Sequence, residues 1–140
     1  MKKQMMIMAI LLGCLIAAGA SRAQAQFVYP VKADIPFSFY VGEKLLPAGI
    51  YQVMEKSQGV MEIQRDDGKA AALFMFNDDQ ERRPPAMSDL VFNKYGDKVF
   101  LSRIEQEGNS EDAVLVKTKL EKMTAQKLDE ESSVSVLLHY

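Results

Sequence analysis

Carboxylates outnumber every other side chain in this sequence that could do chemistry, because the 140 residues include 19 Asp and Glu but one His and one Cys. The candidates are two adjacent pairs, Asp66-Asp67 and Asp78-Asp79, and Glu81. Paired carboxylates hydrolyse glycosides when about 5 to 9.5 Å separates them. Both pairs stand where turns are expected, and adjacent strand residues point to opposite faces. Turn chemistry is the preferred interpretation, and a carboxylate-dependent hydrolase is the alternative.

The sequence offers few side chains suited to metal binding or to catalysis by histidine. Calcium accepts oxygen ligands, and Asn77, Asp78, Asp79 and Glu81 supply them, but their spacing matches no calcium-binding loop. His139 stands beside the C-terminus, where chain ends are usually poorly held, so we expect a surface or sheet-edge residue rather than a general base. With one His and one Cys, zinc lacks its usual ligands. We therefore predict no catalytic, metal-binding or cofactor-binding residue.

The first 25 residues have the pattern of a secretory signal peptide. Lys2 and Lys3 precede an uncharged apolar run over residues 5–20, and Ala23-Gln24-Ala25 offers small residues for cleavage before Gln26. The sequence therefore predicts a signal peptide over 1–25 and a periplasmic or secreted domain over 26–140. No transmembrane segment is expected after cleavage.

Two other interpretations of this end are weaker. Residues 11–14 (LLGC) are similar to a lipobox, which would make a lipoprotein anchored at Cys14, although the apolar run continues through residues 15–18. An uncleaved anchor needs about 20 apolar residues, and the run is shorter.

Charge and cysteine content exclude further classes. Cleavage would remove three of the 17 basic residues and none of the 19 acidic ones, which leaves a net charge of −5. Nucleic acid and anionic membrane surfaces are therefore unfavourable partners. Cys14 is the only cysteine, so the exported domain would have no disulfide and would depend on its apolar core.

Period-two apolar patterns predict a β-rich fold. Residues 35–41 alternate as one strand with Pro36 at an edge, and residues 50–56 read as its return strand. An Asp67-Gly68 type I′ loop would pair Met61 with Phe74 and Ile63 with Ala72. A second hairpin over 90–105, turning at Gly96-Asp97 as type II′, would pair Tyr95 with Lys98 and Phe92 with Leu101. Both faces of this second hairpin are apolar, so each must be covered.

The C-terminal third predicts one helix between two strands. Residues 113–116 and 134–138 read as strands. Thr118 and Glu121 match a capping box at the start of a helix over 119–129. Its apolar stripe is predicted to be Leu120, Met123, Thr124 and Leu128.

The expected fold is a mainly β domain, a small antiparallel sandwich or partly open barrel of six to eight strands with one short C-terminal helix. A barrel interior could take a small apolar ligand, but large aromatic side chains are expected to fill it. The predicted core is Phe37, Phe39, Tyr51, Val53, Met61, Ile63, Phe74, Phe92 and Leu101.

Four segments resemble a known family: 35–42 (IPFSFYVG), 46–53 (LPAGIYQV), 90–102 (LVFNKYGDKVFLS) and 117–121 (KTKLE). In order and spacing they are similar to a family of small exported proteins abundant in Acidobacteria. The resemblance implies export and a β-rich fold over most of the exported domain. It implies no reaction, ligand or catalytic residue, and the tail after Glu130 departs from the pattern.

These observations favour an exported, non-catalytic binding or envelope-associated structural module, because catalysis needs a convergent set of reactive groups. Its partner would be a protein, a glycan or a small apolar ligand. The alternative is the hydrolase named above, acting on envelope polysaccharide.

Overall fold

The computed structural model describes residues 30–80, 83–128 and 131–139. The predicted signal peptide, Cys14 and Glu81 lie outside these residues. Within them the chain is mainly β, with one short helix near the C-terminus, as the sequence predicts, and ten strands rather than six to eight. The elements are β1 (Val31–Ile35), β2 (Phe39–Val41), β3 (Lys44–Leu46), β4 (Gly49–Ser57), β5 (Val60–Arg65), β6 (Ala71–Gln80), β7 (Asp89–Tyr95), β8 (Lys98–Glu105), β9 (Glu111–Leu115), α2 (Lys119–Lys127) and β10 (Ser132–Leu137).

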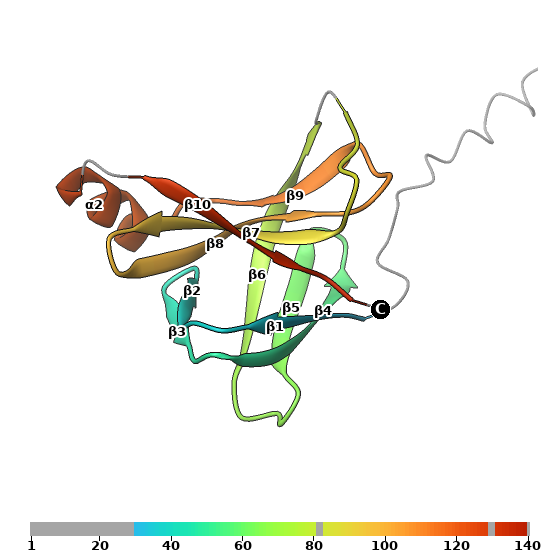
Figure 1. The fold of residues 1–140 in the computed structure, drawn as a ribbon, viewed down its shortest axis with the longest axis horizontal. Helices are drawn as coiled ribbons and strands as arrows, with labels where there is room; N and C mark the ends of the chain where they lie inside the picture. The colour runs from blue at the N-terminus through green and yellow to red at the C-terminus, as the bar shows by residue number, and fades with distance from the viewer. Residues whose placement is uncertain (1–29, 81–82, 129–130, 140) are drawn as a thin grey trace, which may run out of the picture.

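The strands form one curved, open sheet in the order β1-β4-β5-β6-β9-β8-β2-β3, with β7 on β8 and β10 on β7 (Figure 1). β6 joins the two halves, because its first part pairs with β5 and its second with β9. The sheet is not a closed barrel: one isolated bridge, Lys32 with His139, links β1 to the segment after β10. β2 meets β8 in parallel through Tyr40 and Phe100, so the sheet is mixed rather than purely antiparallel.

The single strand predicted over 35–41 is wrong, because β1 ends at Ile35 and β2 begins at Phe39. Pro36 has no N–H to donate to a ladder, and it interrupts the pairing there. β1 then pairs with β4, whereas β2 pairs with β3 and β8. The apolar alternation still predicts burial correctly, since Ile35 and Phe39 are buried and Phe37 is half-buried.

Both predicted hairpin registers are confirmed. The pairs are Met61 with Phe74, Ile63 with Ala72, Tyr95 with Lys98, and Phe92 with Leu101. Because side chains alternate between faces with a period of two, the apolar pattern selects the register wherever one face is buried.

The type I′ turn predicted at Asp67-Gly68 is wrong. Type I′ requires positive φ at both central residues, but Gly68 has φ +71° while no non-glycine residue of the described chain has positive φ. The Gly68 N–H donates to the Arg65 carbonyl at 2.8 Å, and the Lys69 N–H donates to the Asp67 carboxylate at 3.0 Å. This carboxylate contact stabilises a longer turn in which only Gly68 adopts the left-handed conformation.

Aromatic rings fill the space between the two halves of the sheet. Phe92 makes edge-to-face contacts with Phe37 and Phe39, with centroid distances of 5.3 and 5.4 Å, and Phe39 contacts Tyr51 at 5.2 Å. Eight of the nine predicted core residues are buried, and Phe37 is half-buried. The interior is therefore occupied by side chains, as expected.

Helix α2 begins as predicted, but it buries only part of its predicted stripe. The Thr118 hydroxyl accepts a hydrogen bond from the Glu121 N–H at 3.3 Å, which is half of the predicted capping box. The buried residues are Glu121 and Thr124, whereas Met123 and Leu128 are 47% and 40% exposed. The predicted stripe is therefore confirmed only in part. Thr124 is buried and Leu128 lies close to Gly96 in the β7–β8 turn, whereas Glu121, which is not part of the stripe, is buried against Asn93 and Tyr95 of β7.

Candidate binding groove and neighbouring polar cluster

The first predicted pair of acids stabilises the turn between β5 and β6. Asp66 accepts hydrogen bonds from Gln52 Nε2 at 2.7 Å and from Lys32 Nζ at 3.1 Å, which lower its pKa. Asp67 forms a two-bond ion pair with Arg65 that lowers its pKa to about 2. Both carboxylates are therefore engaged in local ion pairs.

The second pair lies at the far end of β6. Asp78 and Asp79 are exposed, and they stand opposite Ala113 and Asp112 of β9. The seven residue steps along the strand from Ala71 to Asp78 span about 23 Å, so the structure does not bring the two pairs together. Among the residues that the structure describes, no three His, Cys, Asp or Glu side chains cluster as metal ligands.

His139 lies at the edge of the sheet. Its backbone N–H and carbonyl exchange hydrogen bonds with those of Lys32, both at 2.7 Å, and its side chain is exposed. This is the sheet-edge position that the sequence predicts.

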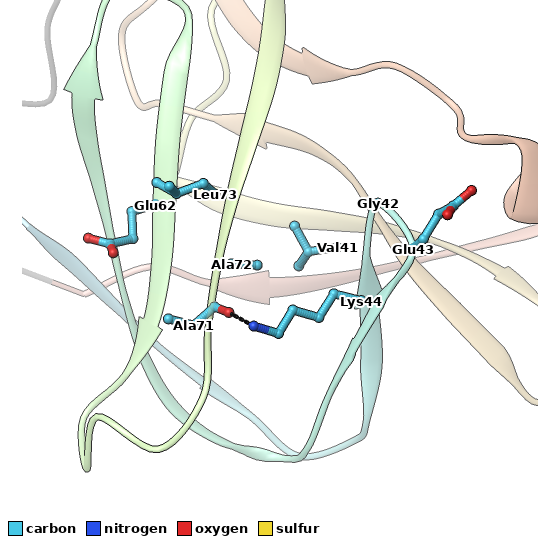
Figure 2. A pocket seen from close by; sticks show the side chains of 8 residues that line it. All are labelled: Val41, Gly42, Glu43, Lys44, Glu62, Ala71, Ala72 and Leu73. Atoms are coloured by element: carbon cyan, nitrogen blue, oxygen red, sulfur yellow. Dashed lines mark hydrogen bonds between the residues drawn. The ribbon is translucent and has the colours of Figure 1, made fainter.

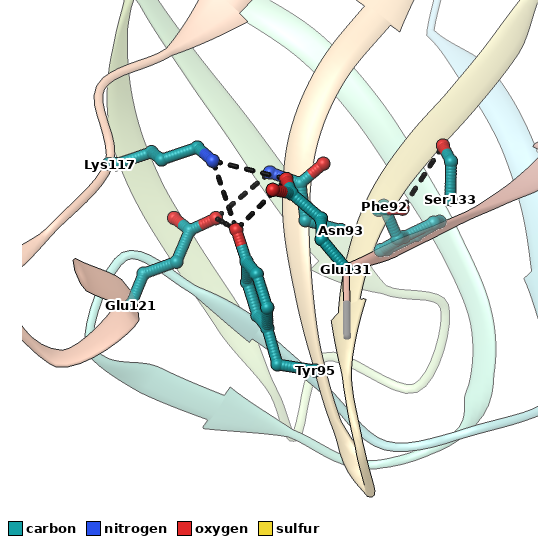
Figure 3. Close-up of polar contacts among 7 residues, drawn as sticks. All are labelled: Phe92, Asn93, Tyr95, Lys117, Glu121, Glu131 and Ser133. Atoms are coloured by element: carbon teal, nitrogen blue, oxygen red, sulfur yellow. Dashed lines mark hydrogen bonds and ion pairs between the residues drawn. The ribbon is translucent and has the colours of Figure 1, made fainter. Parts of the chain in front are cut away.

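A polar cluster connects β7, α2 and the start of the C-terminal tail (Figure 3). It consists of Asn93, Tyr95, Lys117, Glu121 and Glu131, here called the Tyr95 cluster. Lys117 Nζ donates to the Tyr95 hydroxyl at 3.0 Å and to Glu131 at 3.2 Å, while Asn93 donates to Glu121 at 3.0 Å. The Tyr95 hydroxyl lies 3.1 Å from Glu131 Oε1 and 3.4 Å from Glu121 Oε1.

The electrostatics of this cluster favour a structural role. Burial raises the pKa of Tyr95, and its hydrogen bond with Lys117 raises the pKa of that ammonium. Lys117 in turn lowers the pKa of Glu131. A tyrosine that exchanges protons near neutral pH needs a lowered pKa. These shifts have the opposite effect, because they keep Tyr95 neutral, Lys117 protonated and Glu131 ionised.

The sheet opens between β3 and β6, where two adjoining hollows form what we call the β3–β6 groove. The first, of about 550 Å³, is lined by residues 41–44 on one side and by Glu62 and residues 71–73 on the other (Figure 2). The second, of about 380 Å³, shares Gly42 and Leu73 with it and extends to Val116 and Glu121. Glu121 therefore borders the groove and belongs to the Tyr95 cluster.

The groove has an apolar rim. Leu73, Met75 and Val116 are 65%, 75% and 62% exposed, and all three line the second hollow. Single exposed apolar residues are ordinary, but contiguous ones beside a hollow mark a binding surface.

Sequence reasoning did not identify this surface, although a signal was present. In the confirmed register Leu73 stands opposite Glu62 and Met75 opposite Val60, on the outer face of the hairpin. Because Glu62 indicates that this face is exposed to solvent, the large apolar side chains of Leu73 and Met75 on it do not serve to fill the core. The missing information was that the pairing of β6 with β9 ends at Leu115 and that the β2–β3 hairpin borders the remaining part of β6.

No helix of the described residues is long and apolar enough to cross a membrane. In comparisons with known proteins, no family model matches this chain, and neither a curated protein nor a solved structure matches it.

Proposed function

We propose that this chain is an exported, non-catalytic binding module whose binding surface is the β3–β6 groove. The observation that carries the proposal is the groove itself, which consists of two adjoining hollows with an exposed apolar rim. Concave, largely apolar surfaces with a few polar groups are where proteins hold ligands.

The use of the titratable groups supports binding over catalysis. Asp66 and Asp67 stabilise a turn, and the Tyr95 cluster ties α2 to β7. Hydrolysis by paired acids would require two carboxyl groups across one cleft, but Asp66-Asp67 lies in the turn before β6 and Asp78-Asp79 lies at the far end of that strand.

Export is proposed from the first 25 residues, with the domain beginning at Gln26 after cleavage. Intact-mass measurement of the protein made in a bacterial host tests this. A chain that begins at Gln26 is the expected result, whereas an acylated Cys14 would make the protein a membrane-tethered lipoprotein.

Native mass spectrometry of the protein purified from its own envelope, without refolding, tests the groove. We expect a bound species that is lost in Leu73→Lys and retained in Leu137→Lys. Leu137 is a matched control because it is an exposed leucine of β10 that lines a different hollow, beside Met87 and His139. A wild-type chain without a bound species, or one whose species survives Leu73→Lys, would contradict the proposal.

Incubation with envelope polysaccharide tests the hydrolase alternative. We expect no cleavage. Cleavage that Asp66→Asn or Asp78→Asn abolishes would establish the hydrolase instead.

A further inference from the structure

The backbone beside the groove carries unused strand-pairing groups. The Arg65 N–H donates to the Ala70 carbonyl at 2.7 Å, and the Phe76 N–H donates to the Gly59 carbonyl at 3.2 Å. Alternate residues of a strand direct their backbone groups to opposite edges. Residues 70, 72, 74 and 76 therefore face β5, whereas Ala71, Leu73 and Met75 direct their N–H and C=O groups to the other edge, beyond the end of the pairing with β9.

The Lys44 side chain confirms this orientation. Its Nζ donates to the Ala71 carbonyl at 2.5 Å, and Figure 2 shows the side chain extended across the first hollow to reach it. The Lys44 side chain thus binds one backbone acceptor on the edge of β6, an edge with which another strand could pair. Lysine is also a residue that proteins place at open edges to limit unspecific pairing.

The opposite wall is the β2–β3 hairpin, which contributes Val41 of β2, the turn residues 42–43 and Lys44 at the start of β3. β3 pairs with β2, and it is the last strand of its half of the sheet. β2 is parallel to β8, and β8 and β6 are both antiparallel to β9, so β3 runs antiparallel to β6. A strand placed between them would be parallel to one wall and antiparallel to the other.

Resting on the proposed binding function, we infer that the groove takes an extended segment of a partner polypeptide, which adds as a strand against β6. Strand addition obtains affinity from main-chain hydrogen bonds and selectivity from pockets for alternate side chains. The exposed Leu73 and Met75 on the outer face provide apolar contacts for such side chains.

The charges at the groove specify the partner further. Glu43, Glu62 and Glu121 line the two hollows, with Lys44 as the lining cation. Glu62 forms an ion pair with Lys56 at 2.9 Å, and Glu121 accepts hydrogen bonds within the Tyr95 cluster, so Glu43 of the β2–β3 turn is the acid that a partner could meet. This carboxylate at the groove favours a segment that carries Lys or Arg beside its apolar positions. The occupant is thus a basic, β-prone peptide segment.

Hydrogen exchange followed by NMR tests the inference with the synthetic peptide Lys-Val-Thr-Val-Thr-Val-Lys. The Leu73 and Met75 amides are expected to exchange at least about tenfold more slowly with the peptide, because they would become strand donors. The Ala72 and Phe74 amides, which face β5, are the internal control and should not change.

Two control peptides sharpen the result. A version N-methylated at alternate residues should not protect these amides, because it lacks the pairing groups. A version with Glu at both ends should bind more weakly, by a margin that shrinks in high salt. Equal protection by the methylated peptide would overturn strand addition.

The outcomes also separate this inference from the proposed function. If the peptide gives no protection while the envelope-purified protein still carries a species sensitive to Leu73→Lys, the groove binds another ligand and only this inference fails. Protection that rises with protein concentration alone would identify a second copy of the chain as the occupant and would also overturn it. If both experiments fail, the proposed function fails as well.

Discussion

The Tyr95 cluster and the β3–β6 groove meet at Glu121, yet they use polar groups in opposite ways. In the cluster, Tyr95, Lys117, Glu131 and Asn93 hydrogen-bond to one another or to Glu121. In the groove, backbone groups of β6 face an opening that one lysine side chain crosses. The cluster contains the more reactive side chains, but they hydrogen-bond to one another and so hold α2 and the C-terminal tail against β7.

This difference shows why residue chemistry alone is a poor guide to a site in this protein. Satisfied polar side chains stabilise a structure, because an unpaired buried group is costly. Unpaired backbone at a strand edge remains available to a partner. We therefore expect variants in the cluster to change stability and variants in the groove to change binding.

Phe92→Ala should have the largest effect, because it removes a fully buried ring that packs on Phe37 and Phe39. We expect a loss of about 3 to 5 kcal/mol in the free energy of unfolding, measured by urea denaturation. Leu137→Ala, at an exposed position, should cost no more than about 0.5 kcal/mol. Similar losses in the two variants would show that the aromatic contacts are not the core of this fold.

Tyr95→Phe should lower the free energy of unfolding by about 1 to 3 kcal/mol, because it removes a hydroxyl bonded to charged partners. Tyr40→Phe is the matched control, since both tyrosine rings contact Phe100. Within the described residues the Tyr40 hydroxyl forms no hydrogen bond, so its loss should cost about 0.5 kcal/mol or less. Equal costs in denaturation experiments would remove the structural role of the cluster.

Alkaline pH should weaken the same cluster. Tyr95 and Lys117 have pKa values raised above 10.0 and 10.5, so the folded state holds both protons more tightly than the unfolded state. Their contribution is fully present below the unfolded pKa values and is lost as pH rises through the folded ones. The free energy of unfolding should therefore begin to fall at about pH 9 and continue to fall as pH rises through the folded pKa values, and it should fall less in Tyr95→Phe. An identical fall in the two proteins would assign the alkaline loss to other groups.

Leu73→Lys should have the smallest effect on stability. The side chain is 65% exposed and stands opposite Glu62, so the lysine would stay solvated beside an acid. We expect a change within about 0.5 kcal/mol, measured by thermal or urea unfolding, together with the loss of the bound species. A large loss of stability would mean that Leu73 belongs to the core, and it would break the division between the two regions.

Local patterns in the sequence were enough to predict the registers of the two hairpins and most of the buried core. The alternation around Met61, Ile63 and Phe74 predicted which residues face inward, since a slip of one residue would expose the whole apolar set. Thr118 predicted the start of α2 because capping is a contact within one helical turn. The signal peptide is a prediction of the same local kind.

Only the tertiary structure decided how these elements meet. Residues 35–41 alternate without a gap, yet Pro36 divides them between the two halves of the sheet. Glu121 completes a capping box in the sequence, yet in the fold it accepts hydrogen bonds from Asn93 and Tyr95. The groove depends on where β9 ends and where β3 comes to lie, which are contacts between residues far apart in the chain. Short-range periodicity determines which side of a strand is buried, but the neighbours of each strand edge depend on the packing of the whole chain.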